Sequence, residues 1–224
     1  TSRYPVSGYR ALVGHSLGGI FALQVLAQQP ELFDDYLVID PSTWYDNRKF
    51  ANGVLDSLAS GNYEGKSLFV AMANTNNEPD TTRLKLIQTD FSEHQKSILE
   101  FTLRARKLST SGLTFIDRYY PNDDHNSVPM IATYDGLREL FKTYRFSFDG
   151  LHAPDFSPLR SIPDHFARLS KKIKHPMRPS PEFLELCDLY YTVIPDATRK
   201  QETRTLYQQM YPDRAKAYIS KNSQ

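Results

Sequence analysis

The chain has 224 residues and a mass of 25.8 kDa, enough for one large domain or a domain with a small extension. Hydrophobic residues make up 40% of it, including 13 Phe and 14 Tyr, which excludes the disordered and low-complexity classes. The 27 Lys and Arg against 26 Asp and Glu leave a formal charge of +1, too little for a nucleic-acid-binding face. One cysteine excludes an internal disulfide, the absence of Cys and His at zinc spacing predicts no structural metal, and the lack of a long apolar run predicts no membrane span.

Short apolar runs alternate with amphipathic stretches over the first two thirds of the chain, a pattern typical of parallel α/β proteins. We expect strands at residues 9–13, 36–39, 68–73 and 113–116. We expect helices at residues 17–29, 49–58, 92–108 and 131–144. The predicted fold is therefore α/β, with a mostly parallel sheet flanked by helices.

The composition of the sequence changes after residue 148, where prolines become frequent and apolar runs typical of strands no longer occur. We expect a boundary near Asp149, with an α/β domain at 1–148 and a helical extension at 149–224. Apolar residues at steps of three and four predict a helix over 159–173, with Pro163 in its first turn. Two more helices are expected from Pro181 and from Asp196, and the last residues are similar to the start of a tetratricopeptide-type array.

The segment Gly14-His15-Ser16-Leu17-Gly18 has the G-x-S-x-G pattern of a nucleophile elbow. Its context strengthens the pattern, because a predicted strand comes directly before it and a predicted helix directly after. In such a turn the Ser16 hydroxyl points away from the sheet, and a Cβ at either flanking glycine is expected to collide with a neighbouring element. The Leu17 N–H at the helix N-terminus can then donate to a developing oxyanion.

A serine hydroxyl needs an imidazole base and a carboxylate behind it, in the chain order serine, acid, histidine on this scaffold. His125 is the candidate base because it lies in the loop after the last predicted strand; His94 is assigned to a helix. Three carboxylates are candidates for the acid. We favour Asp80, then Glu78, both after the third strand, and then Asp40 at the end of the second.

These residues resemble the putative esterase family of α/β-hydrolases, the esterase D-like branch related to enterochelin and feruloyl esterases. The resemblance covers residues 1–148 and rests on the elbow extended by Gly19, on the segment 40–45 and on the segment 123–129. It implies a serine carboxylester hydrolase that acts on a small-molecule ester through an acyl-enzyme, with Ser16 as nucleophile and His125 as base. This chemistry implies no metal and no organic cofactor. It places Trp44 near the acyl pocket, and we assign Trp44 and His15 to substrate binding.

The resemblance also implies that about half of the hydrolase domain precedes the elbow, whereas fifteen residues precede Ser16 here. We therefore expect the sequence to be a fragment with little activity of its own. Many members of the family that the chain resembles are secreted to the periplasm, so we expect a periplasmic or secreted location, although the sequence given shows no signal segment. The alternative is an inactive hydrolase scaffold whose helical tail binds a protein partner through a basic patch of Arg168, Lys171, Lys172, Lys174 and Arg178.

Overall fold

The computed structural model describes residues 6–108 and 112–222, and these fall into two compact units. One unit is the α/β body, Tyr9–Lys142. The other holds residues 143–222 together with residues 6–8. Among the helices of the described ranges, none is both long and apolar enough to cross a membrane.

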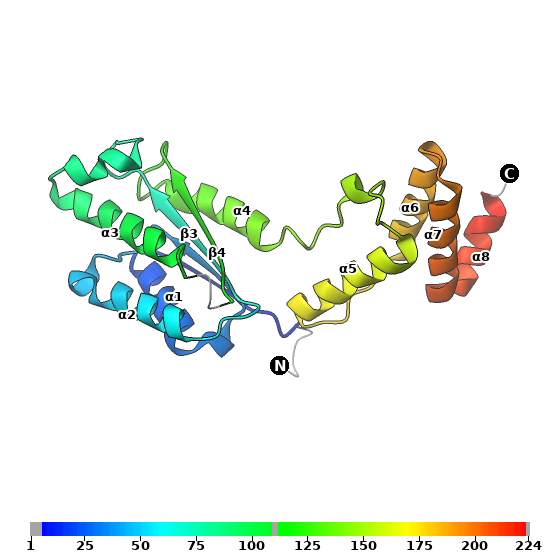
Figure 1. Ribbon diagram of the computed structural model, residues 1–224, viewed down its shortest axis with the longest axis horizontal. Helices are drawn as coiled ribbons and strands as arrows, with labels where there is room; N and C mark the ends of the chain where they lie inside the picture. The colour runs from blue at the N-terminus through cyan, green and yellow to red at the C-terminus, as the bar shows by residue number, and fades with distance from the viewer. Residues whose placement is uncertain (1–5, 109–111, 223–224) are drawn as a thin grey trace. The chain divides into compact units, whose positions relative to one another are not determined.

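The α/β body contains a parallel four-stranded sheet in the order β1-β2-β3-β4 (Figure 1). Its strands are β1 (Ala11–His15), β2 (Asp35–Ile39), β3 (Ser67–Ala73) and β4 (Thr114–Tyr120). The helices that connect and follow them are α1 (Leu17–Gln28), α2 (Lys49–Ser60), α3 (Asp90–Ala105) and α4 (Val128–Leu140). The predicted α/β fold class is confirmed, and β4 is longer than its apolar run because polar Asp117 and Arg118 continue the strand.

Alternating side chains of β2 explain how helices cover both faces of the sheet. Tyr36 and Val38 point into the core formed with α1, α2 and α3, whereas Leu37 and Ile39 point into the core formed with α4. Figure 1 shows α1, α2 and α3 on one side of the strands and α4 on the other. All residues of β2 and β3 are buried, and both strands are apolar in the sequence except for Asp35 and Ser67 at their first positions.

The register of the sheet aligns the ends of β1 and β2. His15, the last residue of β1, is paired with Ile39, the last residue of β2. The next residues along the chain, Ser16 and Asp40, therefore leave the sheet side by side at its carboxyl edge. Ligands and reactive groups of open parallel sheets lie at this edge.

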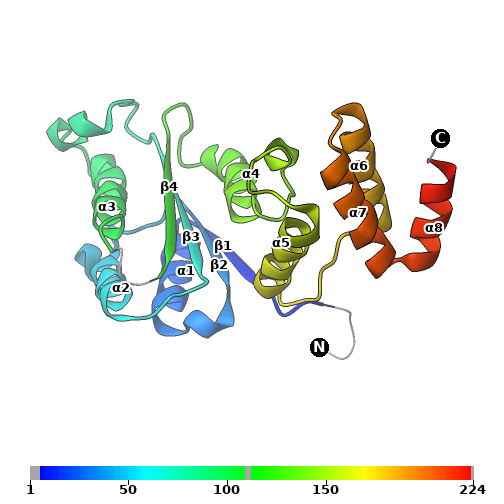
Figure 2. The ribbon, with the colours of Figure 1, turned by 45° about the vertical axis from the view of Figure 1, so that its right-hand side comes forward.

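The second unit is helical (Figure 2). Its helices are α5 (Pro158–Ile173), α6 (Pro181–Val193), α7 (Ala197–Met210) and α8 (Pro212–Lys221). Buried residues of all four helices, including Ile162, Leu184, Leu206 and Ala215, form one core. The likeness of its last residues to a tetratricopeptide array stays a prediction, as does the domain boundary near Asp149.

The prediction that Pro163 lies in the first turn of its helix is wrong. Ser157 is the N-cap residue and α5 begins at Pro158, so Pro163 is the sixth residue of the helix. A proline there has no N–H to donate to the carbonyl of Leu159. Burial of Ile162 and Leu169 on the apolar face of α5 offsets that loss.

Candidate active site

Ser16 occupies the turn between β1 and α1. Its backbone has φ 57° and ψ -120°, a conformation that non-glycine residues rarely adopt. Two backbone hydrogen bonds hold it there: the Ser16 N–H donates to the Ile39 carbonyl, and the Ser42 N–H donates to the Ser16 carbonyl, each at 3.0 Å. The turn is thus tied on both sides to the chain that leaves β2.

The glycines of the elbow are needed for different reasons. A Cβ on Gly14 would lie 2.2 Å from the Gly18 carbonyl oxygen, and one on Gly19 would lie 2.9 Å from the Pro41 side chain. A Cβ on Gly18 would meet nothing within 4 Å, so the expected collision at that position is wrong. Gly18 instead provides the backbone against which Gly14 packs, and Gly14 and Gly19 allow the close approach.

His125 lies within hydrogen-bonding distance of Ser16. Its Nε2 is 3.1 Å from Ser16 Oγ, across 109 residues of sequence. The loop that carries it is held by Asn74, whose N–H donates to the Asp123 carbonyl at 2.8 Å and whose side-chain amide donates to the Pro121 carbonyl at 2.9 Å. The structure therefore brings together the two residues that the sequence singles out as nucleophile and base.

The carboxylate that contacts His125 is Asp40, the third of the three candidates. Asp40 Oδ2 is 2.7 Å from His125 Nδ1, on the side of the ring away from Ser16. Asp80 is exposed and caps the next helical turn, where its Oδ1 accepts hydrogen bonds from the Thr82 N–H and hydroxyl. Glu78 Oε1 accepts from the Asp80 N–H. The order of preference Asp80, Glu78, Asp40 therefore disagrees with the geometry. In the loop after β3, the side chains of Asp80 and Glu78 accept hydrogen bonds from neighbouring residues and do not contact His125.

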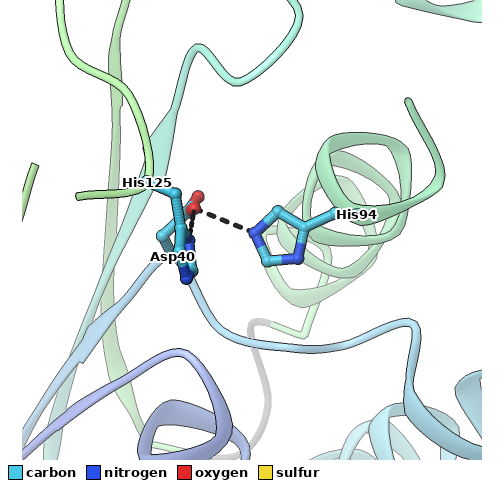
Figure 3. A group of neighbouring side chains, drawn as sticks. All are labelled: Asp40, His94 and His125. Atoms are coloured by element: carbon cyan, nitrogen blue, oxygen red, sulfur yellow. Dashed lines mark hydrogen bonds and ion pairs between the residues drawn. The ribbon is translucent and has the colours of Figure 1, made fainter. Parts of the chain in front are cut away.

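Asp40 is fully buried and receives three hydrogen bonds, of which Figure 3 shows the two from His94 and His125. Oδ1 accepts from the Ala73 N–H at 2.8 Å, and Oδ2 accepts from His94 Nε2 at 2.8 Å as well as from His125. Burial raises the pKa of Asp40, but the hydrogen bond and charge of His94 and the hydrogen bonds of His125 and Ala73 outweigh it, and the pKa lies below its ordinary value. Asp40 is therefore an ionised acceptor.

The hydroxyl of Ser16 faces a cavity of about 400 Å³. Trp44, which is 43% exposed, lies on its wall, and its role in substrate binding stays a prediction. The residues that line the cavity are Ser16, Ser42, Trp44, Thr75, His94, His125 and Asn126. Leu17 is the first residue of α1, so its N–H belongs to the helix-terminal donors that have no acceptor within the helix.

His15, the other residue assigned to substrate binding, lies against the backbone of the His125 loop. Its Nε2 is 3.0 Å from the His125 carbonyl oxygen, and the two rings are 4.5 Å apart. Burial, followed by the charge of His125, lowers the pKa of His15. A neutral His15 with its proton on Nε2 donates to that carbonyl and supports the loop.

Asp40, His94 and His125 are the one group of three metal-binding residue types that lie close together in the described part of the chain. The separations of 2.7 and 2.8 Å between Asp40 Oδ2 and the imidazole nitrogens are those of charge-assisted hydrogen bonds. We therefore interpret the contacts within this group as hydrogen bonds.

Sequence reasoning missed His94 and Asn74. His94, Ser97 and Phe101 follow one another at steps of three and four on α3, which places them on one helix face. A histidine on the buried face of that helix was the feature of the sequence that could have indicated a role for His94. Asn74 directly follows β3, where an amide side chain can bridge two loops, but no pattern in the sequence indicates which loop it contacts.

Residues 1–109 match the family model for putative esterases. A siderophore triacetylfusarinine C esterase of Aspergillus fumigatus is 24% identical over 151 residues, which cover 62% of this chain and 51% of that protein. The ferri-bacillibactin esterase BesA of Bacillus subtilis is 28% identical over 134 residues, which cover 58% of this chain and 42% of that protein. The chain thus spans about half the length of these curated relatives.

Two solved structures cover more of the chain. An IroE-like serine hydrolase from Shewanella oneidensis has 32% sequence identity and a TM-score of 0.69, over 93% of this chain and 62% of that one. An uncharacterised protein from Capnocytophaga ochracea has 12% identity and a TM-score of 0.66, over 93% of this chain and 55% of that one, and so shares the fold. The match of residues 1–109, the parallel sheet and these relatives agree, and the α/β part of this chain is similar to the putative esterases and has the parallel α/β architecture of the α/β-hydrolases.

Proposed function

We propose that the protein is a serine carboxylester hydrolase that works through Ser16, His125 and Asp40. The observation that carries the proposal is the continuous chain of contacts from Ser16 Oγ to His125 Nε2 at 3.1 Å and from His125 Nδ1 to Asp40 Oδ2 at 2.7 Å. This order of hydroxyl, imidazole and carboxylate is the one that activates a serine for attack on an acyl group.

In the proposed reaction, Ser16 Oγ attacks the ester carbonyl carbon while His125 Nε2 takes the hydroxyl proton. Asp40 keeps the imidazole proton on Nδ1 and stabilises the imidazolium cation. The carbonyl oxygen becomes an oxyanion, and the Leu17 N–H at the start of α1 is a donor for it. His125 then protonates the departing alcohol, which leaves an ester between the acyl group and Ser16.

Water completes the cycle by the same route. His125 removes a proton from water, the hydroxide attacks the acyl-enzyme carbonyl, and the proton returns to Ser16 Oγ as the carboxylic acid is released. The names of the relatives favour a siderophore ester as substrate, since the two curated relatives named above are siderophore esterases. The cavity of about 400 Å³ beside Ser16 lies within the size range of small-molecule sites.

The test compares wild type with Ser16→Ala, and with Ser60→Ala as a control for an exposed serine on α2. Hydrolysis of p-nitrophenyl acetate and of triacetylfusarinine C is measured, and a fluorophosphonate probe is mapped by mass spectrometry. We expect Ser16→Ala to lose about 10⁴-fold or more in kcat and to lose the label. Wild-type rates in Ser16→Ala, or labelling of another residue, would refute the assignment.

A further inference from the structure

His94 contacts Asp40 through its side chain and is not used in the proposed reaction. It lies on α3, its side chain is 15% exposed, and its Nε2 is 2.8 Å from the same Asp40 oxygen that contacts His125. Its ring stands edge-on to the His125 ring, with centroids 5.1 Å apart and an interplanar angle of 90°. Figure 3 shows the two imidazoles approaching Asp40 from different elements.

The contact has a defined direction. An ionised carboxylate only accepts hydrogen bonds, so the nitrogen of His94 that faces Asp40 must carry a proton. The same argument places a proton on His125 Nδ1, which leaves Nε2 of the neutral ring as the acceptor for Ser16. Asp40 therefore fixes the protonation of both imidazoles.

Helix α3 is anchored so that His94 stays in place. Ser97, one turn after His94, has its hydroxyl 2.8 Å from the Thr43 hydroxyl, and both residues are buried. Gln95 accepts a hydrogen bond from the Asn76 amide at 2.8 Å. These contacts join α3 to the segments that follow β2 and β3, so His94 is presented to Asp40 from a rigid element.

We propose that His94 is a positioning residue, which holds Oδ2 of Asp40 in the orientation that receives the Nδ1–H of His125. The inference rests on the proposed serine mechanism. The Ala73 N–H anchors Oδ1, and His94 adds an anchor on Oδ2 that does not move with the His125 loop. Without it, the carboxylate is held at Oδ2 only by the imidazole that it is meant to orient.

Two substitutions separate the hydrogen bond from the shape of the side chain. His94→Gln keeps an N–H donor near the position of Nε2, whereas His94→Phe keeps a planar ring and removes the donor. We expect His94→Phe to lower kcat about 10–100-fold, the size of effect usual for partners that orient a reacting group through another residue. KM is expected to stay within about two-fold of wild type, and His94→Gln to restore most of kcat.

The experiment measures kcat, KM and the thermal unfolding midpoint in the full chain, with His175→Gln as a control for an exposed histidine. If His94→Phe lowers the midpoint markedly, His94→Leu replaces it as the donor-free variant. The His94→Phe change is repeated in Asp40→Asn, where we expect an additional loss of less than about two-fold because the two residues act through one contact.

Three results would overturn the proposal. They are an unchanged kcat in the donor-free variants, equal losses in His94→Gln and His94→Phe, and a loss in the Asp40→Asn background as large as in wild type. Ser16→Ala is assayed alongside. If Ser16→Ala keeps its activity, the serine mechanism itself is refuted. If Ser16→Ala loses its activity but the His94 variants keep the wild-type kcat, only the positioning role is refuted.

Discussion

Replacement of Asp40 by asparagine tests the acid directly, because the buried carboxylate faces donors on both of its oxygens. The Ala73 N–H points at Oδ1, and the N–H groups of His94 and His125 point at Oδ2. Asparagine has one carbonyl oxygen and one NH₂ group, so either orientation of the amide sets a donor against a donor.

The two orientations have different costs. If the NH₂ group faces Ala73, a buried N–H loses its acceptor, at a cost of about 1–3 kcal/mol. If it faces the histidines, His94 must accept at Nε2 and His125 at Nδ1, and His125 then carries its proton on Nε2, where it no longer accepts from Ser16. The second orientation needs only a change of tautomer in both histidines, so we expect Asp40→Asn to fold and to lose about 10³–10⁴-fold in kcat.

The assay is hydrolysis of p-nitrophenyl acetate near neutral pH, with unfolding midpoints measured in parallel. Asp80→Asn and Glu78→Gln are the matched controls, because their carboxylates contact local backbone or hydroxyl groups. Both are expected to stay within about two-fold of wild type. The reasoning is refuted if Asp40→Asn retains more than a tenth of the wild-type kcat, or if either control loses as much as Asp40→Asn.

Two further predictions concern the fold. Gly14→Ala should destabilise the α/β body by about 1–3 kcal/mol or more, because its Cβ would meet the Gly18 backbone, whereas Gly18→Ala should not lower the stability. Urea unfolding of both variants measures the free energies, and equal losses of stability would contradict the prediction. Cys187 is buried and its pKa is raised to about 12 by that burial, so we expect it to react with iodoacetamide only after unfolding. Mass spectrometry of native and urea-unfolded protein measures the label, and rapid labelling of the native chain would contradict the packing of α6.

The parts of the site that the sequence predicted well are local. The elbow around Ser16 combines a motif with a strand before it and a helix after it, and His125 follows the last strand directly. Such arrangements depend on neighbours along the chain, which a single sequence shows. The same holds for the apolar runs of β2 and β3.

The acid and its second partner depend on contacts that no local pattern shows. Asp40 reaches His125 because it leaves β2 with φ 41°, a backbone conformation that composition does not reveal. Asp80 and Glu78 lie in a loop whose residues cap a helical turn and support the His125 loop through Asn74. The contact of His94 with Asp40 could not be predicted, because it depends on how α3 packs beside the end of β2 in the tertiary structure.

The pairing of His15 with Ile39 has a consequence for the proposed active site. Ser16 and Asp40 each stand one residue beyond that pair, so their alignment is inherited from the ladder of hydrogen bonds between β1 and β2. A slip of one residue would displace them by about 3.3 Å and turn every β2 side chain to the opposite face. The distance between the proposed nucleophile and the proposed acid is therefore set by the register of the sheet, and a change in that register would separate them even where the helices stay folded.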